Sequence, residues 1–236
     1  MQTAYVIHRR HYGNTSYLIE VFSLEAGRYG VIAKGGQRKL SGFLQPFMPL
    51  LIHTVGRHEL KSLASVECQG HLLALTGRRL YAGLYLNELL YRLLHRDEAH
   101  PTLFEHYEQA LLELVEHSDV EIPLRRFERR LLAELGYGVS FEHDYLGRAI
   151  VADQWYEFKE EEGLIPYESS AITKTQPSLS CYQGEHLLLV SAEAFENALA
   201  RRCAKLIMRQ LLNSLLGSRP LYTRTLFQQP TSTESI

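Results

Sequence analysis

The hydrophobic residues of this chain change their spacing near residue 80, and this change restricts the fold more than any other feature. Before it, short β-branched and aromatic runs are separated by polar breaks, which is typical of β-strands. These runs are residues 4–7, 16–22, 28–33, 50–55 and 63–68. After it, Tyr81, Leu84, Tyr85 and Leu89 recur every three or four residues, as on one face of a helix. The pattern predicts an α+β, multi-domain chain.

Residues 1–80 are predicted to form the first domain. Five short strands with basic residues in their loops fit a small closed barrel such as an OB-fold. An SH3-like barrel would produce nearly the same pattern. Residues 46–49 hold two prolines and interrupt the strand pattern, and Gly56 marks a turn between the last two strands.

Residues 81–236 are predicted to form a helical bundle domain. Apolar stripes over residues 103–114 and 124–135 indicate two further helices, the second of which Gly136 would cap. Ser191 is predicted to begin a long helix that ends at Gly217.

An irregular insertion is predicted within this helical part, over about residues 139–190. It contains an acidic run at Glu160, Glu161 and Glu162 and a stretch rich in Ser and Thr at residues 169–180. We interpret the insertion as a hairpin-like excursion followed by a loop.

The charges are divided unevenly between the two parts. Residues 1–80 hold 10 Lys/Arg against 4 Asp/Glu, a net charge of +6, whereas residues 81–236 hold 15 against 23, a net charge of −8. A basic module attached to an acidic body favours a polyanionic partner for the module. A chance imbalance of surface charge is the alternative.

The cysteines and the apolar runs indicate a cytoplasmic protein. The three cysteines, Cys68, Cys181 and Cys203, are odd in number and widely spaced, which suits reduced thiols better than a disulfide framework. No apolar run approaches the roughly 18 residues of a membrane span, and the N-terminus lacks a secretory segment.

No catalytic motif is recognisable, so we expect neither an enzyme nor a cofactor. The sequence lacks the G-x-S-x-G elbow, the G-x-x-x-x-G-K-S/T phosphate loop and the H-E-x-x-H pair. Gly136-Tyr137-Gly138 lacks the third glycine of a dinucleotide loop. Cys68 and His71 have half the spacing of a metal site but no second pair nearby, so no metal is expected.

An ordered set of motifs resembles the RecO family. The opening strand and basic loop match at residues 4–16 (AYVIHRRHYGNTS), and the family's F-T-x-E-x-G-R and A-K-G-A-R motifs resemble residues 22–28 and 31–35. Further matches follow in the same order at residues 44–47, 81–89, 124–128, 135–138 and 220–227. Each motif alone is weak, but the ordered set is specific.

This resemblance implies an N-terminal OB-fold and a helical C-terminal domain in a mediator of DNA repair and homologous recombination. It implies binding to single- and double-stranded DNA, annealing of complementary strands, and association with RecR and single-stranded-DNA-binding protein. These activities help to load RecA onto DNA.

The sequence departs from the family pattern in two places. Many members carry a four-cysteine zinc site in the insertion, whereas this chain has no C-x-x-C there and only Cys181 at a distance. Structural zinc needs about four N/S ligands, so we predict none. Gly36-Gln37 also replaces the usual small residue and Arg after Lys34-Gly35, which puts a DNA contact at position 37 in doubt.

The predicted DNA-binding residues are cations, because cations replace the counterions of phosphates. They are His8, Arg9, Arg10, Lys34, Arg38, Lys39, Arg57 and Lys61. Tyr12 and Tyr29 are candidates for stacking on bases, and a packing or turn residue is the more common role for a tyrosine such as Tyr12. For each cation taken singly, a solvated surface residue is the alternative interpretation.

The partner-tail residues follow from what the resemblance implies about single-stranded-DNA-binding protein, whose tail is acidic and ends in an apolar residue with a free carboxylate. Such a tail needs arginine beside an apolar slot. The candidates are Arg125, Arg126, Phe127, Arg129, Arg201 and Arg202. A solvated helix face is again the alternative. For the whole chain, the second hypothesis is a structural adaptor whose barrel binds protein rather than nucleic acid.

Overall fold

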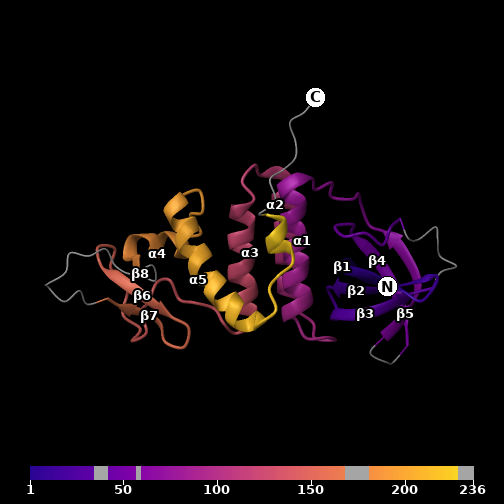
Figure 1. The fold of residues 1–236 in the computed structure, drawn as a ribbon, viewed down its shortest axis with the longest axis horizontal. Helices are drawn as coiled ribbons and strands as arrows, with labels where there is room; N and C mark the ends of the chain where they lie inside the picture. Colours follow the sequence, from indigo (N-terminus) through magenta and orange to yellow (C-terminus); the bar gives the residue numbers. More distant parts are fainter. Residues whose placement is uncertain (35–41, 57–59, 168–180, 228–236) are drawn as a thin grey trace. The chain divides into compact units, whose positions relative to one another are not determined.

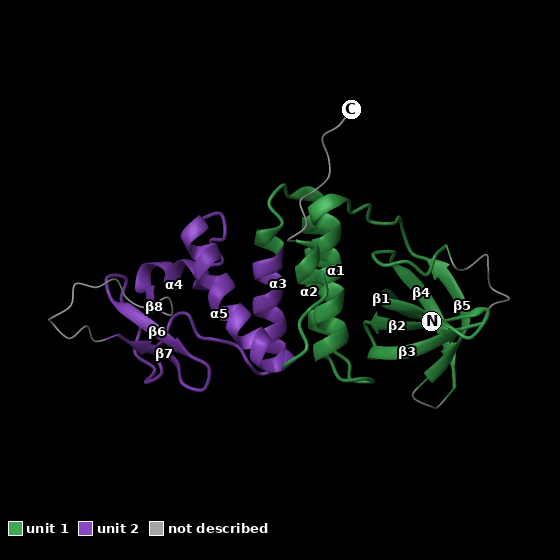
Figure 2. Cartoon of the chain, in the orientation of Figure 1, with its two compact units in different colours: residues 1–123, 218–236 green, residues 124–217 purple. Residues whose placement is uncertain are grey.

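The computed structural model describes residues 1–34, 42–56, 60–167 and 181–227 (Figure 1). The chain forms two compact units, Met1–Pro123 with Ser218–Ile236 and Leu124–Gly217 (Figure 2). The predicted domains, 1–80 and 81–236, have other bounds. They stay a prediction, because compactness does not establish which segments fold on their own.

The first unit begins with a closed five-stranded barrel. Its strands are β1 (Gln2–Tyr12), β2 (Ser16–Ser23), β3 (Gly27–Ala33), β4 (Leu50–Val55) and β5 (Leu60–Cys68). They pair in the order β1-β2-β3-β5-β4, and β1 closes the barrel against β4. All pairs are antiparallel except β3 with β5. The predicted OB-fold is confirmed, and the first strand is longer than the sequence indicated.

Alternate residues of the strands fill the barrel. The core contains Ala4, Val6, Ile19, Val21, Tyr29, Val31, Ala33, Leu44, Leu50, Ile52, Leu63 and Val66. β2 is buried on both faces, because helices cover its outer side. The ring of Phe22 lies 5.4 Å from that of Phe104, and the ring of Tyr5 lies 5.3 Å from that of Tyr107.

Helices α1 (Gly77–Leu93) and α2 (Pro101–Glu116) belong to the same unit and contribute further buried apolar side chains to it. The C-terminal segment with α6 (Thr223–Leu226) also belongs to it. The Glu88 carboxylate accepts hydrogen bonds from the backbone N–H groups of Tyr222 and Thr223, both at 2.9 Å. Arg92 donates to the carbonyl of Arg219 at 3.0 Å. These two side chains of α1 therefore hold the start of residues 220–227, the segment that resembles the family's C-terminal motif.

The second unit contains most of α3 (Glu121–Glu134), a small sheet and two helices. The sheet has the order β7-β6-β8 and comprises β6 (Trp155–Lys159), β7 (Gly163–Pro166) and β8 (Cys181–Gln183). β6 and β7 form the antiparallel hairpin that the insertion pattern predicted, whereas β8 was not expected. The predicted loop at 169–180 lies outside the described residues.

Two helices replace the single long helix predicted from Ser191, so that prediction was wrong. Ser191 ends α4 (Gly184–Ser191), and α5 (Ala198–Leu216) begins after Asn197. The Asn197 side chain accepts hydrogen bonds from the N–H groups of Leu199 and Ala200, and this satisfies two donors that a helix start leaves open. Gly217 ends α5 at a φ of 65°, a conformation that favours glycine.

Candidate nucleic-acid interface

The pairing of β1 with β2 decides which way the basic side chains of residues 8–11 in β1 point. Arg9 lies opposite Ile19, and His11 lies opposite Tyr17. Cross-strand partners share a face, so Arg9 and His11 lie on the barrel-lining side at the end of the hairpin. His8 and Arg10 lie on the outer side, opposite Glu20 and Leu18. The basic run is therefore divided between two faces, which composition alone cannot reveal.

Arg9, His11, Tyr17 and Lys34 gather at one end of the barrel, and we call them the mouth cluster. The Arg9 guanidinium lies 5.1 Å from the Tyr17 ring centroid, and the His11 ring lies 4.7 Å from it. Arg9 Nη1 also donates to the Leu44 carbonyl at 3.0 Å. Tyr17 pairs across the sheet with Ala33, directly before the exposed Lys34.

The mouth cluster combines positive charge with a partly exposed aromatic ring. These are the two requirements for holding single-stranded DNA, because phosphates bind cations and bases stack on rings. Tyr17 and His11 were not among the predicted contacts. The sequence does indicate the position of Tyr17. It lies an even number of residues from the core residues Ile19 and Val21, so its side chain is on the same face of the strand as theirs.

His8 is the least suited of the predicted DNA-binding residues. Its ring stacks on that of Tyr91 in α1, with centroids 4.7 Å apart. Burial lowers the pKa of His8, with Arg10 contributing in the same direction. This shift disfavours the charged imidazolium, although the Glu20 carboxylate opposes it, so His8 is a poorer source of positive charge for phosphates than an arginine. Arg10 is exposed on the same side of the strand.

Lys61 already has partners within the protein. Its Nζ lies 2.7 Å from Asp97 Oδ1 and 4.0 Å from the Tyr29 ring centroid. Tyr29 is 1% exposed, so the structure contradicts its predicted role as a stacking platform. Tyr12, the other candidate, is 46% exposed. Arg38, Lys39 and Arg57 lie outside the described residues.

Two of the predicted tail-binding residues are buried. Arg125 Nη2 donates to Glu128 Oε1 at 2.9 Å, and both side chains are almost fully buried. Phe127 is 1% exposed. An incoming peptide could reach neither residue in this structure.

The other tail candidates are more accessible, and several are already bound to the chain's own acceptors. Arg126 and Arg129 lie 3.9 Å and 3.7 Å from Glu193, and Arg129 also donates to the carbonyls of Val190 and Ser191. Arg201 donates to the Glu196 carbonyl at 3.0 Å.

One face of α5 carries exposed apolar and basic residues in alternation. Arg202 is exposed on it, and Leu199 and Leu206 are 52% and 39% exposed. Arg209, one turn beyond Leu206, is exposed as well. The sequence predicted a helix through this segment, and the structure shows that both leucines are exposed beside arginines.

Within residues 1–34, 42–56, 60–167 and 181–227, no group of three or more His, Cys, Asp or Glu side chains could hold a metal ion. Cys68, Cys181 and Cys203 are free thiols. Among the same residues, no helix is both long and apolar enough to span a bilayer.

A closed OB barrel with a basic mouth, followed by helices, places the chain in the broad class of OB-fold proteins, whose barrels often bind oligonucleotides. Two family models match it, Recombination protein O N terminal over residues 1–71 and Recombination protein O C terminal over residues 74–213. The chain belongs to the RecO family.

Curated relatives agree with this assignment. The chain is 41% identical to the DNA repair protein RecO of Nitrosospira multiformis, over 97% of this chain and 94% of that protein. It is 40% identical to the protein of the same name from Pseudoalteromonas atlantica, over 95% and 92% of the two chains. The Haemophilus influenzae protein is 39% identical, over 97% and 96%.

Proposed function

We propose that this chain is a non-catalytic mediator of DNA repair and homologous recombination that binds single- and double-stranded DNA. The observation that carries the proposal is the mouth cluster on an OB barrel, where Arg9 and His11 contact the partly exposed Tyr17 ring and the exposed Lys34 follows Ala33, the cross-strand partner of Tyr17. The recombination family and the relatives named DNA repair proteins support it.

The proposed contacts determine affinity rather than sequence preference. Cations at the barrel mouth would neutralise phosphates, and stacking on Tyr17 would tolerate any base, because every base has a flat face. A surface that holds single strands without reading them suits annealing of complementary strands. We further propose that the protein acts with RecR in the cytoplasm, at the nucleoid, to help load RecA onto DNA coated by single-stranded-DNA-binding protein.

Salt dependence of DNA binding tests this function against a protein-binding adaptor. A mediator that contacts phosphates should lose affinity steeply for labelled single-stranded DNA between roughly 50 and 200 mM salt, because each contact releases counterions. Fluorescence anisotropy at several salt concentrations measures this slope. Weak binding with a flat slope would favour the adaptor instead.

We also propose that the α5 face holds the acidic tail of single-stranded-DNA-binding protein. Leu199 and Leu206 offer apolar surface to its terminal side chain, while Arg202 and Arg209 offer donors to its carboxylates. This location differs from one centred on Arg125, whose guanidinium is buried against Glu128.

Arg202→Ala should weaken binding of a peptide copying this tail roughly ten- to a hundredfold, because a hydrogen bond to a charged group contributes about 1.5–3 kcal/mol. Arg202→Lys should retain only part of the parental affinity for the peptide, since the ammonium group lacks the planar fork of arginine. Fluorescence anisotropy with labelled peptide measures both variants, and Arg148→Ala in the same unit is the control. If Arg202→Ala and Arg209→Ala both bind the peptide like the parent, the tail binds elsewhere.

A further inference from the structure

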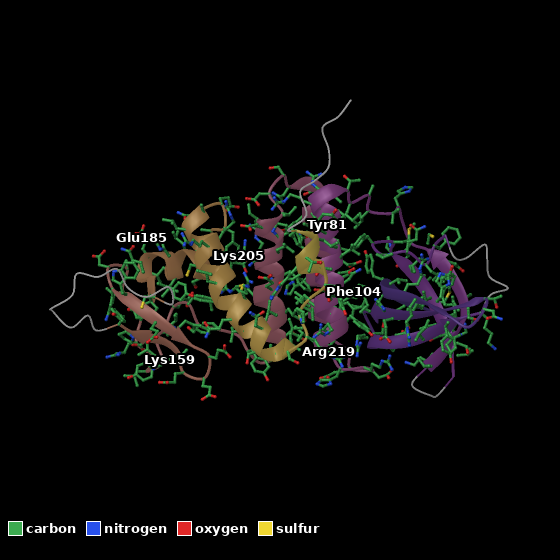
Figure 3. All side chains as sticks on the ribbon, viewed as in Figure 1. Tyr81, Phe104, Lys159, Glu185, Lys205 and Arg219 are labelled. Atoms are coloured by element: carbon green, nitrogen blue, oxygen red, sulfur yellow. The ribbon has the colours of Figure 1, made fainter. Side chains whose placement is uncertain are left out.

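The second unit has a hollow of about 300 Å³ that the proposed function does not use. The residues that follow α3 form one wall, the turn between β6 and β7 forms another, and Leu211 of α5 completes the lining. The labelled Lys159 marks the end of β6 beside this turn in Figure 3.

The floor of the hollow is apolar and its rim carries two exposed tyrosines. Phe158, Leu164 and Leu211 are each at most 5% exposed, whereas Tyr137 and Tyr145 are 50% and 47% exposed. Exposed tyrosines beside a hollow are common where proteins bind one another, because the ring contributes contact area at little entropic cost.

Backbone hydrogen bonds fix the positions of both tyrosines. Tyr137 N donates to the Leu132 carbonyl at 2.7 Å, in the turn where Gly136 has a φ of 84°. Tyr145 N donates to the Leu164 carbonyl at 2.9 Å. The tyrosine backbones are thus held in place before any ligand arrives, which reduces the ordering cost of binding.

The surroundings of the hollow are strongly acidic. Four carboxylates line the hollow, those of Asp144, Glu160, Glu161 and Glu162, and none of the described residues that line it is Lys or Arg. Glu160, Glu161 and Glu162 line the hollow from the β6–β7 turn and are exposed. Lys159 offsets one of them, since its Nζ lies 3.6 Å from Glu162 Oε1. Phosphates would be repelled here, so the hollow is unsuited to DNA.

We propose that this hollow docks a segment of a partner protein that carries arginine or lysine. The apolar floor suits the aliphatic stem of such a side chain, the tyrosine faces attract its cation, and the glutamates complement its charge. The hollow is large enough for a side chain or two and too small for a folded domain. The inference goes beyond the proposed function, which assigns DNA and an acidic tail to other surfaces.

A labelled peptide of repeated Gly-Arg-Ser units, titrated onto the full chain without DNA, tests the proposal. The peptide should bind at low salt, and the same peptide with citrulline in place of arginine should not, because citrulline keeps the shape and lacks the charge. Glu160→Gln combined with Glu161→Gln should weaken binding about tenfold. The matched control, Asp153→Asn combined with Glu185→Gln, should leave it unchanged.

Substitutions of Tyr145 distinguish recognition by an aromatic ring from attraction by the negative charge alone. Tyr145→Leu should weaken peptide binding about threefold while Tyr145→Phe retains it, because phenylalanine keeps the ring face that attracts cations. Three results would overturn the proposal: equal binding of the citrulline peptide, equal weakening by the control pair, or displacement by spermidine at the affinity of the peptide. The last would indicate a site for small cations. Since no DNA is present, failure here leaves the proposed function untouched.

Discussion

Replacing Arg9, Arg10, Lys34 and Arg38 together with glutamate should weaken single-stranded DNA binding roughly 100-fold or more at moderate salt. Each cation that contacts a phosphate releases counterions on binding, and reversing its charge adds repulsion. In the alanine version of this variant, the slope of log affinity against log salt should become shallower by roughly 0.7 for each phosphate that is no longer neutralised. The weakening should be similar for different DNA sequences, since phosphate contacts do not read bases.

Arg9 needs a separate control because it also donates to the Leu44 carbonyl inside the barrel. The variant Arg10→Glu with Lys34→Glu avoids this bond and reverses two exposed charges. Arg202→Glu with Arg209→Glu reverses two charges on α5 and should leave DNA affinity nearly unchanged. Circular dichroism establishes that each variant is folded. If the quadruple variant binds DNA with the parental affinity and salt slope, the barrel mouth is the wrong surface.

The barrel was predictable because β-branched and aromatic residues gather in five short runs that polar breaks separate. β2 differs from a half-buried strand, since residues 18–23 are all buried. Burial of every residue in this stretch means that both faces of the strand are covered, and here helices cover the outer one. The sequence could not show which helices, because that contact joins Phe22 to Phe104, far along the chain.

The individual site residues were harder to predict, because the type of a residue shows its charge but not which way its side chain points. Arg125 was predicted to be a peptide contact, yet Ile122, Arg125 and Leu132 share one side of α3 at helical spacing, and Ile122 and Leu132 are buried. Glu128, three residues on, provides the partner that makes the burial of Arg125 tolerable. An arginine beside an apolar stripe with a nearby glutamate therefore fits an internal ion pair as well as a binding site.

The break between α4 and α5 was missed for a related reason. Serine is a good residue before a helix, but Asn197 is equally good, and the actual start depends on which side chain reaches the free N–H groups. Ala192 to Glu196 read as helical by composition. Phe195 is fully buried within this turn, and Glu193 has a φ of 53°, so tertiary packing decided the local conformation.

Glu20→Ala should destabilise the first unit by about 3–5 kcal/mol, because it leaves buried positive charge without a partner. The Glu20 side chain is 4% exposed on the outer side of β2. Arg28 Nη1 lies 3.4 Å from Glu20 Oε2, and Arg96 Nη2 donates to Glu20 Oε1. Arg28 is 14% exposed, and burial lowers the pKa of its guanidinium while the Glu20 carboxylate raises it.

This carboxylate also joins strand to helix. Arg28 Nη1 donates to the Tyr91 carbonyl of α1 at 2.8 Å, and Arg96 follows that helix. Gly30 lies beside the group, where an added Cβ would come within 2.7 Å of Leu60 Cδ2 and within 3.4 Å of Arg96 Nη2 and Glu20 Oε1. Loss of Glu20 should therefore loosen the packing of α1 against the barrel as well as lower the free energy of unfolding.

Denaturant unfolding of a small variant set can separate the charge effect from simple loss of volume. Glu20→Ala should be much less stable than Glu105→Ala, which removes an exposed glutamate of α2 and should change stability by less than about 0.5 kcal/mol. Glu20→Leu combined with Arg28→Met removes the two more buried charges and should recover much of the stability, since apolar replacement of a buried pair is often nearly neutral and the remaining Arg96, at 33% exposed, can turn to solvent. If Glu20→Ala is no less stable than Glu105→Ala, the ion group does not hold the barrel to α1. If the double variant is as unstable as Glu20→Ala, the destabilisation comes from packing rather than from uncompensated charge.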